Sequence, residues 1–349
     1  MPTRPIQPYH VSVMELLGLD KGELSALCVE LGHPAFRGKQ IADWLYSKGV
    51  REISGMSNLP AGLREQLAGA GTLSRCEVVG ESRSSDGAVK YLLRLADGET
   101  IETVLLPYSD RTSVCVSTQV GCRMGCLFCA TADCGFVRNL GPGEIVDQVI
   151  TLQELGGRRV THVVLMGMGE PLMNLANVVK AMRLLNDEMG ISMRRITLSS
   201  VGITPAIDKL AALDLQITLA ISLHAPNDEL RAMLIPIATK YPLKGLIQAC
   251  GRYADSTKRR LTFEYLLISG VNDKPEHAAE LVRLLSGMLA HVNLIPYNEV
   301  EGKRYRKPSR QAVSEFRRVL ENGGMEVTQR LERGKDISAA CGQLRSRTE

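Results

Sequence analysis

Three cysteines fall within eight residues of this chain, at Cys122, Cys126 and Cys129. Their pattern is C-x3-C-x2-C, and Gly121 and Gly125 precede the first two, where glycine allows the backbone to wrap closely around a ligand. Three thiolates at this spacing can bind three irons of a [4Fe–4S] cluster and leave the fourth iron open to an exchangeable ligand. The sequence therefore predicts an iron–sulfur site with one reactive iron.

Two alternatives to an iron–sulfur site stay open for these cysteines. Cys134 would supply a fourth thiolate, and four thiolates suit a structural zinc ion. The usual zinc pattern has two separated C-x2-C pairs, however, and this stretch has one. Chance clustering of core cysteines is the second alternative, and it would be unusual for three cysteines in so short a segment.

The composition is that of a globular protein with a large core. The chain has 349 residues, of which 44% are hydrophobic and 23% charged, so we expect two or three domains. No run of 18 uncharged apolar residues predicts a membrane span, and residues 1–17 lack the apolar region of a secretory signal. We therefore expect a cytoplasmic protein whose nine cysteines stay reduced and form no disulfide framework.

The net charge of +4 is unevenly distributed. Residues 300–349 hold 12 Lys/Arg against 7 Asp/Glu, so the rest of the chain carries no excess of positive charge. A solvated basic surface would explain this pattern, and so would contact with a phosphate backbone. The run Lys258-Arg259-Arg260 is a second basic segment that would suit nucleic acid.

The elements that must position the cysteines form a repeated strand–helix pattern over residues 108–300. This alternation predicts an α/β fold with a parallel sheet, either a partial (β/α)6 TIM-like barrel or a doubly wound sheet. In both folds the active site lies after the carboxyl ends of the strands, and the cysteine motif directly follows the first strand, expected over Val114–Val120. The other strands should begin near Thr161, Arg195, Ile217, Leu261 and His291, with helices over Glu144–Leu155, Leu175–Met189, Pro205–Leu213, Asp228–Leu234, Pro242–Ala254 and Pro275–Leu285.

Three further segments flank this barrel. Residues 1–70 show helical periodicity and should form a small accessory domain. Residues 71–107 alternate with a period of two around Ser85-Asp86-Gly87 and Asp97-Gly98, which predicts an antiparallel β-meander. Residues 301–349 form the basic extension, with a helix over Ser309–Leu320 and a strand over Met325–Arg330.

Small polar residues gather where four of the predicted strands end. Because the carboxyl ends of parallel strands meet at one edge, these side chains should line a cofactor site there. A histidine alone is more often structural, but its place in this group favours a role in the site. The predicted cofactor-binding residues are Gly169, Glu170, Ser199, Ser222, Leu223, His224 and Asn298.

With Phe128 before the third cysteine, the motif resembles that of the radical S-adenosylmethionine (SAM) superfamily, C-x3-C-x-aromatic-C. The resemblance implies that the open iron of the cluster binds the amino and carboxylate groups of SAM. One electron, from a reducing donor such as flavodoxin, then cleaves SAM to a 5′-deoxyadenosyl radical. The alternatives are a radical SAM enzyme acting on a small molecule or peptide, and a non-catalytic zinc or iron–sulfur protein that binds RNA.

Residues 33 to 345 also resemble one subfamily, the RNA methyltransferases that place a methyl group on C2 of adenine in 23S rRNA (adenine 2503) and tRNA (adenine 37). A related enzyme that methylates adenine C8 shares the reactive cysteines and is the alternative. The segments that carry the resemblance are Phe36–Gln40 with Trp44, Gln119–Cys122, Met166–Pro171, Ile221–Asp228, Asn293–Asn298 and Ala339–Leu344.

This resemblance implies a mechanism with two SAM molecules per turnover. Cys341 takes a methyl group from the first SAM, and the radical made from the second removes a hydrogen atom from that methyl. The resulting carbon radical adds to C2 of adenine, and Glu102 takes the C2 proton. Cys115 then attacks the Cys341 sulfur, forms a transient disulfide and releases the methylated RNA. The helical domain would help to hold the RNA.

Overall fold

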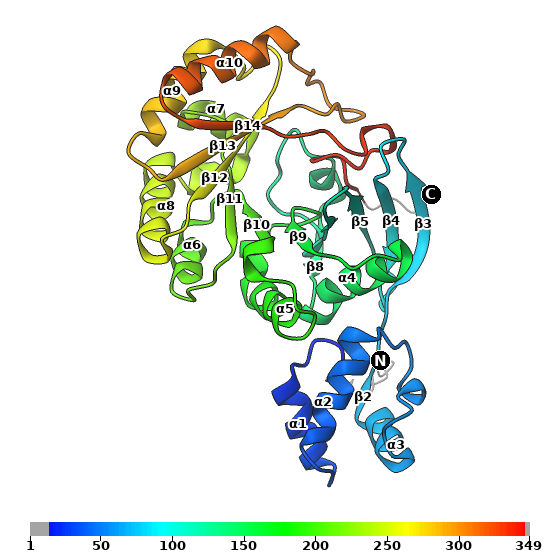
Figure 1. Cartoon of the computed structure of the whole chain (residues 1–349). Coiled ribbons are helices and arrows are strands. Elements are labelled where there is room, and N and C mark those ends of the chain that lie inside the picture. Colours follow the sequence, from blue (N-terminus) through cyan, green and yellow to red (C-terminus); the bar gives the residue numbers. More distant parts are fainter. Residues whose placement is uncertain (1–13, 346–349) are drawn as a thin grey trace, which may run out of the picture.

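A computed structural model describes residues 14–345, so parts of the predicted segments 1–70 and 301–349 lie outside the described residues. The centre is a ten-stranded sheet in the order β14-β13-β12-β11-β10-β9-β6-β5-β4-β3 (Figure 1). In this sheet β6 and β9 to β14 run parallel, whereas β3, β4 and β5 are antiparallel. The parallel strands are β6 (Thr112–Cys115), β9 (His162–Leu165), β10 (Ile196–Ser200), β11 (Thr218–Ser222), β12 (Leu261–Leu267), β13 (Ala290–Pro296) and β14 (Glu326–Gln329).

Helices connect the parallel strands and cover one face of the sheet (Figure 1). Because β14 and β3 end the strand order and do not pair with each other, the barrel is partial, as the sequence predicts. The predicted helices are confirmed to within a few residues at each end. They are α4 (Pro142–Gly156), α5 (Leu175–Asp187), α6 (Thr204–Ala211), α7 (Asp228–Leu234), α8 (Leu243–Thr257), α9 (Pro275–Leu285) and α10 (Arg310–Asn322), with short turns η3 (Ala130–Cys134), η4 (Pro171–Asn174), η5 (Met193–Arg195), η6 (Pro236–Lys240) and η7 (Lys335–Ile337).

The first barrel strand is shorter than the sequence predicts. Strand β6 ends at Cys115, and the expected continuous strand over Val114–Val120 is wrong. The amides of Thr118 and Gln119 both donate to the carbonyl of Met168, at 2.8 and 3.2 Å, so the chain turns out of the ladder with β9. It then forms a separate two-stranded sheet from β7 (Gln119–Gly121) and β8 (Phe136–Asn139).

The predicted meander forms an extension of the barrel sheet. Strands β3 (Glu77–Arg83), β4 (Val89–Arg94) and β5 (Thr100–Pro107) pair in sequence order, and β5 then pairs with β6, with Val104 opposite Cys115. The last segment of the chain returns to this meander, where the Asp336 carboxylate accepts a hydrogen bond from the amide of Ser85. The C-terminal segment therefore crosses from the barrel to the meander, as the red trace in Figure 1 shows.

The N-terminal unit lies at the lower edge of Figure 1 and packs as a small helical body. A capping box between Asp20 and Glu23 begins its first helix, and buried leucines join the helices. Among the described residues, no helix is long and apolar enough to cross a bilayer. The elements are β1 (Met14–Glu15), α1 (Lys21–Glu30), α2 (Phe36–Ala42), η1 (Asp43–Ser47), η2 (Ile53–Gly55), α3 (Ala61–Ala70) and β2 (Gly71–Thr72).

A buried arginine fastens this unit to the barrel. The Arg75 guanidinium pairs with Asp147 and, at 3.2 Å, with Glu154, both on α4, and donates to the carbonyl of Gly49 at 2.6 Å. The side chains of Arg75 and Asp147 are almost fully buried, so this contact is a built interface rather than a surface ion pair. The helical unit therefore has a defined position beside α4.

Candidate active site

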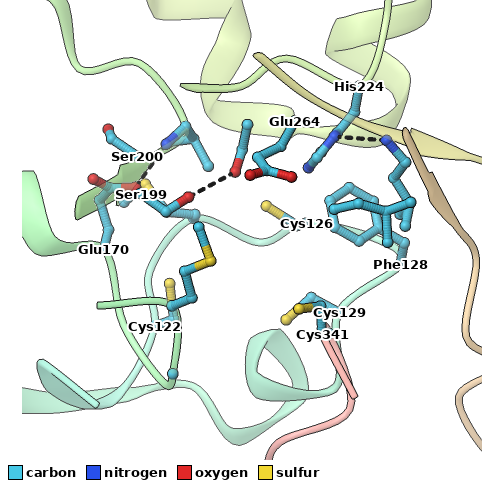
Figure 2. Close-up of a pocket in the computed structure, with 18 of the residues that line it drawn as sticks. Cys122, Cys126, Phe128, Cys129, Glu170, Ser199, Ser200, His224, Glu264 and Cys341 are labelled. Carbon is cyan, nitrogen blue, oxygen red and sulfur yellow. Dashed lines mark hydrogen bonds between the residues drawn. The ribbon is translucent and has the colours of Figure 1, made fainter. Parts of the chain in front are cut away.

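Cys122, Cys126 and Cys129 line one cavity at the carboxyl end of the barrel (Figure 2). The loop that carries them requires glycine at its start. Gly121 has φ +74°, and a Cβ there would lie 2.0 Å from the carbonyl oxygen of Gly135. This close approach lets the amide of Cys122 donate to that same oxygen at 2.6 Å, which fixes the first turn of the loop.

The three thiols suit a polynuclear cluster better than a single ion. Within residues 14–345, no three His, Cys, Asp or Glu side chains converge closely enough to hold one metal ion, and Cys134 is not in the lining of the cavity. Burial raises the pKa of Cys122 to about 12 and raises those of Cys126 and Cys129 as well. Thiols in such a site become thiolates only beside a strong positive charge, which bound iron supplies.

The opposite wall of the cavity comes from the ends of β9, β10, β11 and β12. It includes Gly169, Glu170, Ser199, Ser222 and His224, all of which the sequence predicts as cofactor-binding residues. The cavity opens to solvent, and residues of the cysteine loop and of the strand ends line it together. A cofactor can therefore touch the cysteine loop and the polar strand ends together.

Glu170 is the buried acid of this wall. Its carboxylate accepts hydrogen bonds from the amides of Leu172 at 3.0 Å and Val201 at 2.9 Å, and its own amide donates to the Gln119 side chain. Burial outweighs these bonds and raises the pKa of Glu170 to about 7. A carboxylate that burial has made basic is suited to receive an ammonium group, such as the amino group of an amino acid.

Gly169, next to Glu170, gives the cofactor wall its shape. Its φ is +107°, and a Cβ at this position would lie 2.7 Å from Cβ of Gln119. Glycine is therefore needed here both for backbone conformation and for the close passage of the two loops.

His224 faces the cavity as a neutral ring. Its Nδ1 accepts a hydrogen bond from the amide of Leu266 at 3.1 Å, so Nε2 carries the proton. Burial lowers the pKa of His224 to about 3, with a smaller contribution from the positive charge of Arg231. The ring packs edge-on against Phe128, with 5.1 Å between the ring centroids, which links the wall to the cysteine loop.

Of the remaining predicted cofactor residues, the two serines line this cavity, whereas Leu223 and Asn298 do not. The hydroxyls of Ser199 and Ser222, both in the lining of the cavity, lie 3.3 Å apart across neighbouring strands. Leu223 is fully buried and does not line the cavity. Asn298 is also buried and lines a second, adjoining cavity, where its Oδ1 has no hydrogen-bond partner in the described part of the chain.

Four residues of the site were missed by the sequence prediction. Ser200 follows a predicted serine, and Glu264 is an acid inside an otherwise apolar strand, so both had a local signal. Arg330 ends a predicted strand, and its guanidinium lies 3.9 Å from the Glu264 carboxylate. Arg231 had no signal, because a charged residue in a short helix suggests a solvent-facing position.

Arg231 holds the strand ends together from behind the site. Its fully buried guanidinium donates to the carbonyls of Val201 at 2.5 Å, Leu223 at 3.2 Å and Tyr241 at 3.4 Å. These carbonyls belong to the loops after β10, β11 and η6. Arg231 therefore joins the loops after the third and fourth barrel strands, β10 and β11. This contact fixes the ends of the two strands, where Ser199 and Ser222 lie.

Cys115 and Cys341 come together in the second cavity. Neither thiol is in a disulfide, and the cavity is lined by apolar residues such as Val104, Leu106 and Met166 and by the charged residues Arg330, Glu332 and Arg333. Cys341 also lines the first cavity, so its sulfur lies between the two. Burial, with a smaller contribution from the nearby Cys341, raises the pKa of Cys115 to about 12.

The C-terminal segment reaches this position by binding to the cysteine loop. The amide of Ala130 donates to the carbonyl of Gly342 at 2.7 Å, and the Thr131 hydroxyl donates to the carbonyl of Leu344 at 2.6 Å. These bonds place Cys341 between the cofactor wall and the meander.

Glu102 lies beside the two cavities but lines neither. It shares the face of β5 with Val104, two residues away, which lines the second cavity. Its carboxylate accepts a hydrogen bond from the amide of Arg345 at 2.7 Å and pairs with Lys90 at 2.8 Å. Burial raises its pKa above the ordinary value, although both partners oppose the shift.

The basic run Lys258-Arg259-Arg260 lies elsewhere. It directly precedes β12, so it lies at the amino end of a barrel strand, while the cavities lie at the carboxyl ends. Arg260 is paired with Glu326, and Arg259 donates to the carbonyl of Ile217. This segment is therefore not part of the site.

Fold and site together define a radical SAM enzyme, and comparison with known proteins agrees. A family model described as "Radical SAM superfamily" matches residues 116–282. A second model, "Ribosomal RNA large subunit methyltransferase N-terminal domain", matches residues 14–72. The enzymes of this superfamily use a [4Fe–4S] cluster and SAM, and the cysteine loop with its facing polar wall fits both groups.

Similar proteins define the family more narrowly. A protein of Gloeobacter violaceus called "Probable dual-specificity RNA methyltransferase RlmN" is 50% identical over 333 residues, 95% of each chain. One of the same name from Symbiobacterium thermophilum is 51% identical over 96% of this chain and 92% of its own. The crystal structure of a radical SAM methyltransferase from Sphaerobacter thermophilus matches with a TM-score of 0.91 and 46% identity, covering 95% of this chain and 99% of that one. This chain belongs to the RlmN family of radical SAM RNA methyltransferases.

Proposed function

We propose that this enzyme methylates C2 of adenine in 23S rRNA, at adenine 2503, and in tRNA, at adenine 37. The observation that carries the proposal is the position of Cys341, whose thiol lines both the cofactor cavity and a second cavity shared with Cys115. A methyltransferase that passed the methyl group directly from SAM to RNA would have no use for this pair of thiols. The name of the similar proteins, dual-specificity RNA methyltransferase, supports RNA as the substrate.

The target carbon explains why a thiol carrier is useful. C2 of adenine is not nucleophilic, so it cannot attack the methyl group of SAM. The bound cluster and SAM supply a 5′-deoxyadenosyl radical, made with one electron from a reducing donor such as flavodoxin. Cys122, Cys126 and Cys129 would hold the cluster, while Gly169, Glu170, Ser199, Ser222 and His224 would hold SAM. Of the other two residues predicted for SAM, Leu223 would support this wall from the core, and Asn298 would act from the second cavity.

The chain's own residues then carry the methyl group. The Cys341 thiolate displaces S-adenosylhomocysteine from a first SAM and becomes S-methylcysteine. Methylated Cys341 loses one hydrogen atom to the radical made from a second SAM, and its methylene carbon bonds to C2. This adduct would give up one electron to the oxidised cluster held by the three cysteines, and loss of the C2 proton then restores the aromatic ring. Glu102, which lies two residues from Val104 in the lining of the second cavity, would take that proton.

Release of the product requires the second thiol. The Cys115 thiolate attacks the Cys341 sulfur, forms a disulfide and breaks the bond between that sulfur and the methylene carbon. The carbon leaves with the electron pair, takes up a proton and becomes the methyl group on C2. The disulfide must then be reduced by an external thiol, which suits an enzyme of the cytoplasm.

Mass spectrometry tests the proposal directly. The enzyme is incubated with a reductant, SAM and either a 23S rRNA fragment or tRNA, and the RNA is digested to nucleosides. We expect 2-methyladenosine from both RNAs, together with a Cys341 peptide that is heavier by one methylene group before RNA is added. Detection of 8-methyladenosine instead would move the reaction to C8, and an unmodified Cys341 peptide in active enzyme would refute the carrier role.

A further inference from the structure

Three cavities adjoin one another along the C-terminal segment of the chain. The first and second share Arg330 and Cys341, and the second and third share Arg330, Leu331 and Glu332. The third lies between the end of β14 and the start of α10. A substrate that reaches Cys341 from this side would therefore lie close to Leu331, which lines both the second and the third cavity.

The third cavity is strongly basic. Lys307, Arg310, Arg317 and Arg330 line it, against a single acid, Glu332. Several of these charges are already paired, since Lys307 binds Glu332 and Arg317 binds Glu321, both at 2.6 Å. Within residues 14–345 the exposed guanidinium of Arg310 has no acidic partner, so it is available to an anion.

An exposed leucine stands where the second and third cavities meet. The Leu331 side chain is 70% exposed, although most leucines of this chain are buried. It lines both cavities, between the cation of Arg330 and the acid of Glu332. An apolar side chain so placed contributes little to the core, and proteins that distort nucleic acids use such side chains as wedges between stacked bases.

We infer that the third cavity binds the phosphate backbone beside the target nucleotide, and that Leu331 fills the gap in the base stack when the target adenine turns into the second cavity. This inference rests on the proposed function. An adenine inside a folded RNA must leave its stack to reach Cys341, and the apolar residues in the lining of the second cavity, among them Val104 and Leu106, suit its flat faces. Arg310 would contact phosphate, which positions the RNA without reading its sequence.

A fluorescent RNA separates the two roles. The probe is an anticodon stem–loop of tRNA in which 2-aminopurine replaces the target adenine, because 2-aminopurine becomes brighter when it leaves the stack. With Leu331→Ala we expect binding within about threefold of the unaltered enzyme but a loss of most of the fluorescence increase, and methylation of the natural stem–loop slowed about tenfold. With Arg310→Ala we expect weaker binding and a slope of log affinity against log salt that is shallower by about one.

Matched controls come from the other end of the barrel. Leu289 is 58% exposed and directly precedes β13, and Arg194 is an exposed arginine that precedes β10. Leu289→Ala and Arg194→Ala should behave like the unaltered enzyme in every assay. If Leu331→Ala gives the full fluorescence increase, the wedge is refuted. If Arg310→Ala and Arg194→Ala have equal affinity and salt slope, the phosphate contact is refuted.

A separate measurement tests the proposed function on its own. The unaltered enzyme is incubated with SAM and no RNA, and the mass of the Cys341 peptide is determined. An unmethylated peptide would contradict the proposed function, whatever Leu331→Ala and Arg310→Ala do. If the peptide is methylated but Leu331→Ala and Arg310→Ala both bind and unstack the probe normally, the inference is refuted and the proposed function is not.

Discussion

The thiols of Cys115, on β6, and Cys341, in the C-terminal segment, line the same cavity between the meander and the barrel. The two residues lie at opposite ends of the catalytic part of the sequence, and the contacts of Gly342 and Leu344 with the cysteine loop bring them together. This arrangement gives one thiol access to the sulfur of the other once a group bound to Cys341 has entered the second cavity.

Replacing Cys115 should trap the RNA on the enzyme. In Cys115→Ala the bond from Cys341 to C2 still forms, but no thiol is present to break it. We expect a protein–RNA species that survives a denaturing gel and no second turnover. The double variant Cys115→Ala/Cys341→Ala is the matched control and should show no such species. Normal multiple turnover by Cys115→Ala would show that Cys115 does not resolve the intermediate.

Replacing Arg231 should weaken both the fold and the binding of SAM. Arg231→Met leaves the buried carbonyls of Val201, Leu223 and Tyr241 without their donor, which should lower the free energy of unfolding by about 3–5 kcal/mol. The Michaelis constant for SAM should rise more than the turnover number falls, because the strand ends that carry Ser199 and Ser222 lose their support. Arg252→Met, which removes an exposed ion pair with Asp208, should change neither quantity appreciably.

Much of the fold was predictable because its signals are local. The spacing of apolar residues located every barrel helix, and the Asp-Gly turns located the meander. The cysteine loop was equally clear, since three ligands and two glycines stand within a few residues of one another.

What the sequence could not show depends on contacts between distant segments. The chain turns after β6 because the amides of Thr118 and Gln119 donate to the Met168 carbonyl and do not continue the ladder with β9. The role of Arg231 depends on carbonyls from three separate loops. The position of Lys258-Arg259-Arg260, by contrast, could have been predicted from the sequence. A segment that directly precedes a parallel strand must lie at the end of the barrel opposite the site.

The cysteine loop should hold its cluster without Cys134. Cys126→Ala removes a thiol from the cavity lining, so anaerobically reconstituted protein should lose the brown colour, most of its iron and all cleavage of SAM. Cys134→Ala should keep its iron and its turnover within about twofold, because Cys134 does not line the cavity. Loss of bound metal from Cys134→Ala, with zinc in the unaltered protein, would favour the four-cysteine zinc site instead.

His224 should make the protein less stable in mild acid. Its pKa is about 3 in the folded protein and about 6.5 when unfolded, so between these values the unfolded state binds the extra proton. Stability from this group is therefore present above pH 6.5 and is lost as the pH falls, by about 2 kcal/mol between pH 7 and pH 5.

Asparagine is a suitable replacement for His224, because it tolerates the positive φ of this position. Urea denaturation of the unaltered protein and of His224→Asn at pH 7 and pH 5 gives the difference. The variant should lose less stability than the unaltered protein on acidification. Parallel losses in the two proteins would mean that the histidine is not held neutral in the fold.

Lys90 should set the pH range of catalysis through Glu102. Burial raises the pKa of the Glu102 carboxyl, and the Lys90 ammonium, 2.8 Å away, limits that rise. In Lys90→Met the pKa of Glu102 should therefore increase further. A base acts only when deprotonated, so the acidic limb of the profile of kcat/KM against pH should move to higher pH. Methylation of Cys341, which does not use the C2 proton, should keep its own pH dependence. Lys180→Met, which removes an ion pair with Glu23 on the N-terminal unit, is the matched control and should leave both profiles in place. An unchanged acidic limb in Lys90→Met would show that Glu102 does not take the proton from C2.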